Sequence, residues 1–341
     1  MRKAMNFITA AGLAVMAVAA PAYAEAATEA VSEAAVAAEG LQIGQIYTAA
    51  HGDKGFTQAV AVVEGDTVVA AYINEFQFME NTDETVAVPN SDAGFGEGYA
   101  EGVVLTNKRD NTAVYSALLA EKAGATNTID GNFDAIQAYA AGKTIAELDE
   151  TAASENAIDT VSSATLADTA NYVKAIADAA RAAQENEAVA YDGDAADLKL
   201  NVAYGAAHGE KCFTTAAVLT DGTDIVLSYI DEFQFMEASD TTVAVPNSDA
   251  GFGEGYAEGV VLTSKRENTE NYSALLAEKA SATNTIDGNF DAIQNHVNGM
   301  SIADAEALSQ EDAVAAADAV SGATLADTVN YVGLIVETAK Q

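Results

Sequence analysis

Two short segments of the sequence combine residue types that favour covalent modification of a hydroxyl group. Residues 159–165 read Asp-Thr-Val-Ser-Ser-Ala-Thr and residues 318–324 read Asp-Ala-Val-Ser-Gly-Ala-Thr, so both fit the pattern Asp-x-x-Ser-(Gly/Ser)-Ala-Thr. A threonine hydroxyl among small residues is accessible to a modifying enzyme. The N-terminus of the helix expected after each segment would offer backbone N–H groups and the positive end of its dipole to a phosphate.

The hydroxyl groups of these segments also have a purely structural interpretation as caps of the helix that follows. The residues that could form such caps are Ser162, Ser163, Thr165, Ser321 and Thr324. One segment alone would not separate the two interpretations, but two copies, each with an aspartate six residues before the threonine, favour a functional site over simple helix caps. Because Ser163 stands where the second copy has Gly322, we expect the first site to be tighter and less efficiently modified.

The two segments belong to a tandem repeat that organises the whole chain. Residues 86–106 recur without change as residues 243–263, and 47 of the 52 positions in 86–137 are identical to 243–294. The offset is 157 residues there and 159 by Asp159 and Asp318. A period of this length indicates two domains rather than a solenoid. We therefore predict domains at 41–182 and 198–341, joined by a linker at 183–197.

Each copy has the same predicted elements. A short strand near Tyr47 precedes a hairpin, 56–63 and 67–73, which turns at Gly65. A glycine-rich loop, 94–102, leads into a further strand at 103–106. Helical periodicity follows at 115–122 and 133–140, with Asp130 as the expected N-cap of the second helix, and the last helix presents one apolar face. Strands early and helices late predict an α+β fold, with a small antiparallel sheet and packed helices in each domain.

The N-terminus predicts export from the cytoplasm. Arg2 and Lys3 precede an apolar run that ends in Pro-Ala-Tyr-Ala at 21–24, which is typical of a secretory signal peptide cleaved after Ala24. A membrane anchor would need roughly 20 apolar residues, and this run is shorter. No cysteine adjoins the cleavage site, so no lipoprotein anchor is expected, and we predict a secreted or cell-envelope protein that does not span the membrane. The Ala/Glu-rich segment 25–40 is predicted to be a flexible leader.

Composition excludes several functional classes. The chain of 341 residues has 52 acidic and 15 basic side chains, giving a net charge of −37, so nucleic acid is not an expected partner. The single cysteine, Cys212, and three histidines provide no disulfide framework, iron–sulfur ligand set, zinc ligand set or Ser-His-Asp triad. We therefore predict no catalytic residues and no metal site, and redox work would need an added cofactor.

The Asp-x-x-Ser-(Gly/Ser)-Ala-Thr segments resemble the flavinylation motif of the FMN-binding domain family. That family occurs in peripheral subunits of bacterial sodium-pumping and related redox complexes, and in secreted electron-transfer flavoproteins of Gram-positive bacteria. The resemblance also includes residues 47–56 and covers nearly all of the chain beyond the signal peptide. It implies two FMN groups, each joined through its phosphate to Thr165 or Thr324. The residues implied to bind FMN are Asp159, Ser162, Ser163, Ala164, Thr165, Asp318, Ser321, Gly322, Ala323 and Thr324.

The resemblance implies an electron carrier more than a turnover enzyme. The implied partners are an FMN transferase that attaches the cofactor, a membrane redox donor, and an extracellular electron acceptor or reductase. The alternative is a non-redox surface binding module whose FMN-binding domains are degenerate. Neither the donor, the acceptor, the two midpoint potentials nor the oligomeric state follows from the sequence.

Several other repeated residues admit two interpretations. Lys108 and Arg109, with Lys265 and Arg266, could place a cation near a flavin, or could be solvated in a turn. Phe95 and Tyr99, with Phe252 and Tyr256, could stack on a flavin ring, but aromatic residues beside glycines are more often loop anchors. For His51 and His208 we expect turn histidines bonded to the backbone rather than proton donors. Cys212 matches Gly55 in the first copy, which argues against a shared catalytic thiol.

Overall fold

The computed structural model describes residues 40–280 and 282–341. The predicted signal peptide and all but the last residue of the predicted leader lie outside the described residues. In this part of the chain no helix is long and apolar enough to cross a membrane.

The described chain contains two similar sets of elements. The first repeat consists of β1 (Leu41–Thr48), β2 (Gly55–Glu64), β3 (Thr67–Glu80), η1 (Gly94–Gly98), β4 (Val103–Asn107), α1 (Thr112–Ala123), α2 (Ile129–Ala140), α3 (Ile145–Ala152), α4 (Ala157–Thr160) and α5 (Thr169–Gln184). After η2 (Ala195–Asp197), the second repeat consists of β5 (Lys199–Gly205), β6 (Cys212–Thr220), β7 (Ile225–Glu237), η3 (Gly251–Gly255), β8 (Val260–Ser264), α6 (Thr269–Ala280), α7 (Ile286–Val297), α8 (Ile302–Ser309), α9 (Ala313–Ala319) and α10 (Thr328–Ala339).

Each repeat forms a four-stranded antiparallel sheet, in the order β1-β2-β3-β4 and β5-β6-β7-β8. The predicted hairpin is confirmed, with Gly65 at φ 64 between β2 and β3, where glycine adopts the left-handed region without strain. β3 continues to Glu80, well beyond the predicted end at Ile73, because it pairs with β4 there. The α+β fold class is confirmed.

Helices cover one face of each sheet. The apolar face predicted for the last helix is buried in α5, where Val173, Ile176 and Ala180 pack against the sheet through residues such as Ile73. The second repeat has an equivalent core built from α7, α10 and the strands of its own sheet. Apolar periodicity thus places one helical layer on each sheet.

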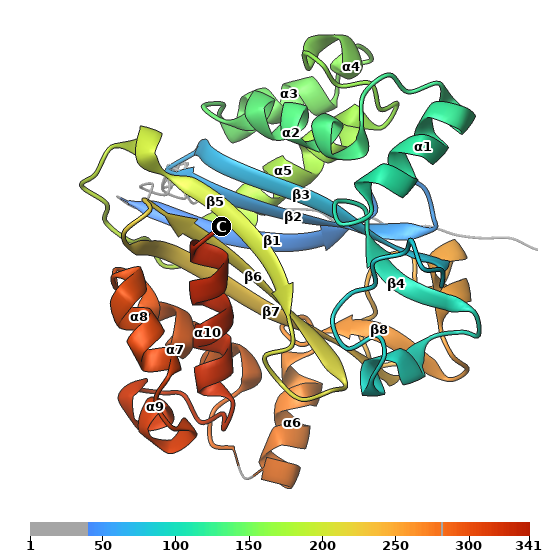
Figure 1. Cartoon of the computed structure of the whole chain (residues 1–341). Coiled ribbons are helices and arrows are strands. Elements are labelled where there is room, and N and C mark those ends of the chain that lie inside the picture. The colour runs from blue at the N-terminus through green and yellow to red at the C-terminus, as the bar shows by residue number, and fades with distance from the viewer. Residues whose placement is uncertain (1–39, 281) are drawn as a thin grey trace, which may run out of the picture. The chain divides into compact units, whose positions relative to one another are not determined.

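The other faces of the two sheets pack against each other. One shared core contains Phe56, Phe76 and Phe95 of the first repeat and their counterparts Phe213, Phe233 and Phe252 of the second. A second shared core joins residues such as Ile43 and Val62 to Val226 and Leu227. Figure 1 shows the blue strands β1–β3 beside the yellow β5–β7, with the helices of each repeat on the far side of its sheet. β2 is consequently buried on both faces along nearly its whole length.

Backbone pairs between the repeats are reciprocal. The Ala100 N–H donates to the Gly255 carbonyl at 2.9 Å, and the Ala257 N–H donates to the Gly98 carbonyl at 2.9 Å. Phe95 and Phe252 are each 1% exposed within the shared core, so the interpretation of these two aromatic residues as loop anchors is confirmed.

The segment between the repeats follows the first sheet. α5 extends to Gln184, and Val189 then pairs with Leu41 through two backbone hydrogen bonds of 2.8 and 2.9 Å. Part of the predicted linker 183–197 therefore lies against the edge of β1.

Some local predictions were wrong. The N-cap of α2 is Thr128, whose hydroxyl accepts the Gly131 N–H, whereas Asp130 lies in the first turn of the helix. Asp130 binds the Thr112 hydroxyl at 2.7 Å instead. The short helices α3, α4, α8 and α9 were not predicted, because they are too short for a clear apolar period.

A buried polar group lies between the repeats and differs between the copies. Asp231 of the second repeat accepts hydrogen bonds from the Tyr47 hydroxyl at 2.8 Å and the Ser264 hydroxyl at 2.5 Å. Its counterpart, Asn74, donates to the Tyr204 hydroxyl at 2.9 Å. Burial, the largest effect, raises the pKa of Asp231 above its ordinary value.

The shared aromatic core predicts that one large cavity destabilises both repeats. Phe233→Ala removes a buried ring that contacts Tyr47, Phe56 and Phe76 of the first repeat. We expect the free energy of unfolding to fall by about 3–5 kcal/mol. Hydrogen exchange should accelerate in both repeats together. The exposed Val314, 70% accessible, provides the control, because Val314→Ala should change stability little. Faster exchange confined to residues 198–341 would contradict a shared core.

Asp231→Asn should change the pH dependence of stability. An acid whose pKa is raised on folding stabilises the fold less as the pH rises, because the unfolded chain loses its proton first. The parent should therefore lose free energy of unfolding, relative to Asp231→Asn, as the pH rises above the ordinary aspartate pKa. Urea denaturation of both proteins across a pH series measures this difference. If the free energy of unfolding varied with pH in the same way in both proteins, Asp231 would not contribute to the pH dependence of stability.

Candidate functional site

The two threonines of the repeated motif are held in the same way. The Thr165 N–H and hydroxyl both donate to Oδ1 of Asn132, at 2.6 and 3.1 Å. Thr324 makes the same two contacts with Asn289, also at 2.6 and 3.1 Å. The two asparagines are fully buried in the first turn of α2 and of α7. Each threonine loop is therefore tied to the start of a helix far away in the sequence.

The rest of each motif lies at the surface around the threonine. Thr165 is half-buried and Thr324 is exposed, while Ser162, Ser163 and Ser321 are exposed. Asp159 lies in α4 and Asp318 in α9, both exposed. Ala164 is buried and Ala323 half-buried, both packing toward the core of their own repeat. The motif thus presents hydroxyl groups to solvent on a loop that is anchored from below by its alanine.

The structure contradicts the capping interpretation of these hydroxyl groups. α5 begins at Thr169 with Asp168 as its N-cap, and α10 begins at Thr328 with Asp327 as its N-cap. Neither Thr165 nor Thr324 is needed to cap a helix.

The same N-caps weaken the expected role of the helix dipole. An aspartate carboxylate stands at the N-cap of the last helix of each repeat, although it accepts no hydrogen bond from the helix backbone and contacts a histidine instead. In α2 the Ile129 N–H already donates to the Ser116 hydroxyl at 3.0 Å, and the Gly131 N–H to the Thr128 hydroxyl at 3.3 Å. The hydroxyl contacts of Thr165 involve the Asn132 amide and no cationic side chain.

His51 and His208 pair with carboxylates. Nδ1 of His51 lies 2.6 Å from Oδ2 of Asp168, and Nδ1 of His208 lies 2.6 Å from Oδ2 of Asp327. The expectation that these side chains bond to the backbone was wrong. Each pair links the first turn of a repeat to the residue that caps its last helix, three residues after the motif threonine.

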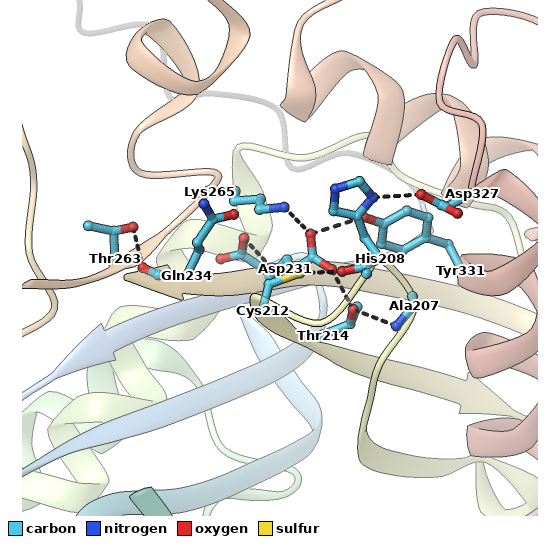
Figure 2. A network of polar contacts seen from close by, with 12 residues as sticks. Ala207, His208, Cys212, Thr214, Asp231, Gln234, Thr263, Lys265, Asp327 and Tyr331 are labelled. Atoms are coloured by element: carbon cyan, nitrogen blue, oxygen red, sulfur yellow. Dashed lines mark hydrogen bonds and ion pairs between the residues drawn. The ribbon is translucent and has the colours of Figure 1, made fainter. Parts of the chain in front are cut away.

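A buried ion pair lies beneath each of these turns. Nζ of Lys108 is 2.8 Å from Oε1 of Glu75, and the side chains are 2% and 1% exposed. The second repeat pairs Lys265 with Glu232, as Figure 2 shows around the labelled Lys265, Asp231 and Tyr331. The interpretation of these lysines as solvated turn residues was wrong.

A tyrosine hydroxyl and the ring of a second tyrosine complete each ion pair. The ring belongs to Tyr115 beside Lys108 and to Tyr272 beside Lys265. The Tyr172 hydroxyl donates to Glu75, and the Tyr331 hydroxyl donates to Glu232 at 3.0 Å. Burial is the largest cause that raises the pKa of both phenols, so they remain protonated donors. Burial, the largest single effect, would lower the pKa of Lys265, but the charge and hydrogen bond of Glu232, together with the nearby Cys212 and Tyr272, raise the pKa above its ordinary value. The lysine therefore remains charged inside the protein.

The adjoining arginines are also structural. Nε of Arg109 donates to the Ile73 carbonyl at 2.9 Å, and its guanidinium lies 4.9 Å from the centre of the Tyr72 ring. Arg266 makes the equivalent contacts with Ile230 and Tyr229. Both arginines join the sheet to the second helix of their repeat through Asp134 or Asp291.

A cavity of about 280 Å³ lies against the His51 turn. Residues 51–55 form one wall, and Glu75, Gln77 and Tyr115 form the rest. His51 lines this cavity and also contacts Asp168, three residues after Thr165, so the cavity and the Thr165 loop adjoin the same His51–Asp168 contact. Two features fit a planar aromatic group: the Thr165 hydroxyl could serve for its attachment, and the cavity has one aromatic wall, Tyr115, and polar groups such as His51 and Glu75.

In the second repeat a cysteine replaces the last glycine of the first turn. Cys212, at the position of Gly55, is 1% exposed and donates through its thiol to the His208 carbonyl. Burial is the largest cause that raises the pKa of this thiol above its ordinary value, so it is not a reactive thiolate.

Asn132, Asn289 and the Glu–Lys–Tyr groups were not identified from the sequence. Both asparagines lie in segments that are identical in the two copies, where no position stands out from its neighbours. Glu75 lies within β3 and Lys108 directly follows β4, so the signal that could have found them is a charged residue within or directly after a mainly apolar strand. Among the described residues, no three His, Cys, Asp or Glu side chains are grouped as metal ligands.

We compared the chain with protein-family models, curated proteins and solved structures, and none of the three comparisons found a match.

Backbone strain distinguishes the two motif loops. Ser163 has φ 70 and Gly322 has φ 94, both in the left-handed region that costs a non-glycine residue about 1–2 kcal/mol. An added Cβ at Gly322 would lie 3.2 Å from Cβ of Ala292. We expect Gly322→Ser to lower the free energy of unfolding by about 1–2 kcal/mol, measured by urea denaturation. The reciprocal variant, Ser163→Gly, should lower stability by less or raise it. Equal losses in both variants would show that the loop conformation does not require glycine.

Proposed function

We propose that this protein is a secreted electron carrier with two FMN groups, joined through phosphoester bonds to Thr165 and Thr324. The observation that carries the proposal is the duplicated motif, whose threonine hydroxyls lie on accessible loops and cap no helix. The resemblance of this motif to a flavinylation signal supplies the identity of the cofactor. The donor is proposed to be a membrane redox protein and the acceptor an extracellular compound or reductase.

The residues around each threonine support covalent attachment in particular. Asn132 and Asn289 hold the backbone N–H of the threonine, so the loop stays in place when its hydroxyl is esterified. The hydroxyl contacts of Thr165 include no cation that would bind a phosphate by charge alone. A covalent bond would also retain the cofactor outside the cell, where a reversibly bound nucleotide would be lost by dilution.

The cavity beside His51 supports the placement of a flavin ring near the first threonine. Tyr115 offers an aromatic surface, and His51 and Glu75 offer polar groups along its walls. A bound flavin would supply reversible one- and two-electron transfer. The chain's own residues would orient the ring and limit its contact with water.

An FMN transferase that uses FAD is the maturation partner that this proposal requires. The threonine oxygen would displace AMP from the FMN phosphate of FAD, which breaks the pyrophosphate bond and releases the hydroxyl proton. The exposed Ser162 and Ser163 and the half-buried Thr165 form the surface that such an enzyme would meet. Gly322 gives the second loop a glycine at its left-handed position, and we expect the transferase to modify Thr324 faster than Thr165.

The central experiment measures flavin on the protein. The chain is co-expressed with an FMN transferase, denatured, and examined for flavin fluorescence on the gel band and for two added FMN phosphoryl units by mass spectrometry. Thr165→Ala and Thr324→Ala should each remove one unit, and the double variant should remove both. Thr160→Ala is a matched control, because Thr160 is exposed in α4 near the first motif but is not its final threonine.

A colourless band and an unmodified mass for the parent would favour the alternative of a non-redox binding module. Two units retained in the double variant would place the attachment elsewhere in the chain.

A further inference from the structure

We propose that each attachment site is positioned by the opposite repeat, through contacts that we call the cross-repeat clamps. The first clamp consists of Asn247 and Phe252 acting on residues 51–55, beside the Thr165 site. The second consists of Asn90 and Phe95 acting on residues 208–212, beside the Thr324 site. That Thr165 and Thr324 are attachment sites rests on the proposed function, whereas the clamps themselves are hydrogen bonds of the structure.

The first clamp satisfies three carbonyl groups of one turn. Nδ2 of Asn247 donates to the carbonyls of Gly52 at 2.9 Å and Gly55 at 2.7 Å. The backbone N–H of Phe252 donates to the Asp53 carbonyl at 2.7 Å. The turn that forms a wall of the first cavity is therefore held by residues of the second repeat.

The second clamp consists of the equivalent contacts, made by the first repeat to a turn of the second. Nδ2 of Asn90 donates to the carbonyls of Gly209 at 2.8 Å and Cys212 at 2.7 Å. The backbone N–H of Phe95 donates to the Glu210 carbonyl at 2.7 Å. Because Phe95 and Phe252 are buried in the shared core, both clamps have rigid bases.

Each clamped turn leads directly to the threonine loop of its own repeat. His51 follows Ala50, whose carbonyl accepts a hydrogen bond from Asn171 of α5 at 2.9 Å. His51 itself binds Asp168, the N-cap of α5, three residues after Thr165. The turn is thus fixed on one side by its own last helix and on the other by the opposite repeat. Loss of the clamp should release His51 and Asp168 before it affects the distant site.

The backbone of the clamp residues identifies a clean variant. Asn90 and Asn247 have φ 63 and 64, a conformation that asparagine tolerates better than most residues and glycine adopts freely. Substitution by glycine therefore removes both side-chain donors while keeping the backbone path. Asn90→Gly and Asn247→Gly serve as controls for each other, because they make the same chemical change in the two repeats.

The experiment compares the parent chain, Asn247→Gly and Asn90→Gly by two measurements. Without flavin, the imidazole resonances of His51 and His208 are followed by NMR and assigned with His51→Gln and His208→Gln. After co-expression with an FMN transferase, the rates of FMN attachment at Thr165 and Thr324 are measured by mass spectrometry of the separate peptides.

The effects should cross between the repeats. Asn247→Gly should shift the His51 resonances and slow attachment at Thr165 about tenfold, as expected for the loss of two hydrogen bonds. It should leave His208 and Thr324 as in the parent. Asn90→Gly should shift His208 and slow attachment at Thr324. A residue that merely stabilises the fold would affect both sites alike.

Several results would overturn the proposal. The proposal is wrong if neither histidine resonance shifts, or if a variant slows FMN attachment equally at both threonines. It is also wrong if the effects of a variant are confined to the repeat that carries it. If the parent gains no FMN while the histidine shifts still cross, the clamps are supported and the flavin assignment fails. If Asn247→Gly does not fold, Asn247→Asp also removes the amide donors, and the same crossed pattern is required of it.

Discussion

The structure depends on the burial of two apolar faces on each sheet. In β2, residues that point to either side are buried, because helices cover one face and the opposite sheet covers the other. A single repeat could cover only the first face by itself, and the phenylalanines of its second face would then meet water. Removal of that apolar surface from water is a large driving force for the pairing of the repeats. The clamps and the buried polar contacts between the repeats form within the geometry that this packing sets.

The repeat and its main elements could be predicted because they depend on local patterns. Alternation and glycine indicate the hairpin at Gly65, and helical periodicity indicates the face that includes Val173 and Ile176. The packing of the two sheets could not be predicted in this way. An apolar residue such as Phe76 indicates burial but not which surface covers it.

The candidate site, too, could be predicted from the sequence only in part. The motif threonines, and the difference between Ser163 and Gly322, follow from residue type and comparison of the copies. The left-handed backbone at both positions is known only from the structure. The roles of Asn132, Asp168 and Lys108 arise from contacts between residues distant in sequence, so no local pattern contains them. Lys108 illustrates the difficulty, because a basic pair in an acidic protein is usually solvated, and only Glu75 and the Tyr115 ring make its burial tolerable.

The reciprocal contacts between the repeats have a consequence for how the two copies can diverge. Residues around Asn90 and Phe95 are identical to those around Asn247 and Phe252, and each set contacts the turn of the other copy. A substitution in one copy therefore changes a surface that the other copy must still fit. Duplication usually frees one copy to drift, but here the two halves should evolve as partners, with accepted changes concentrated where they do not touch.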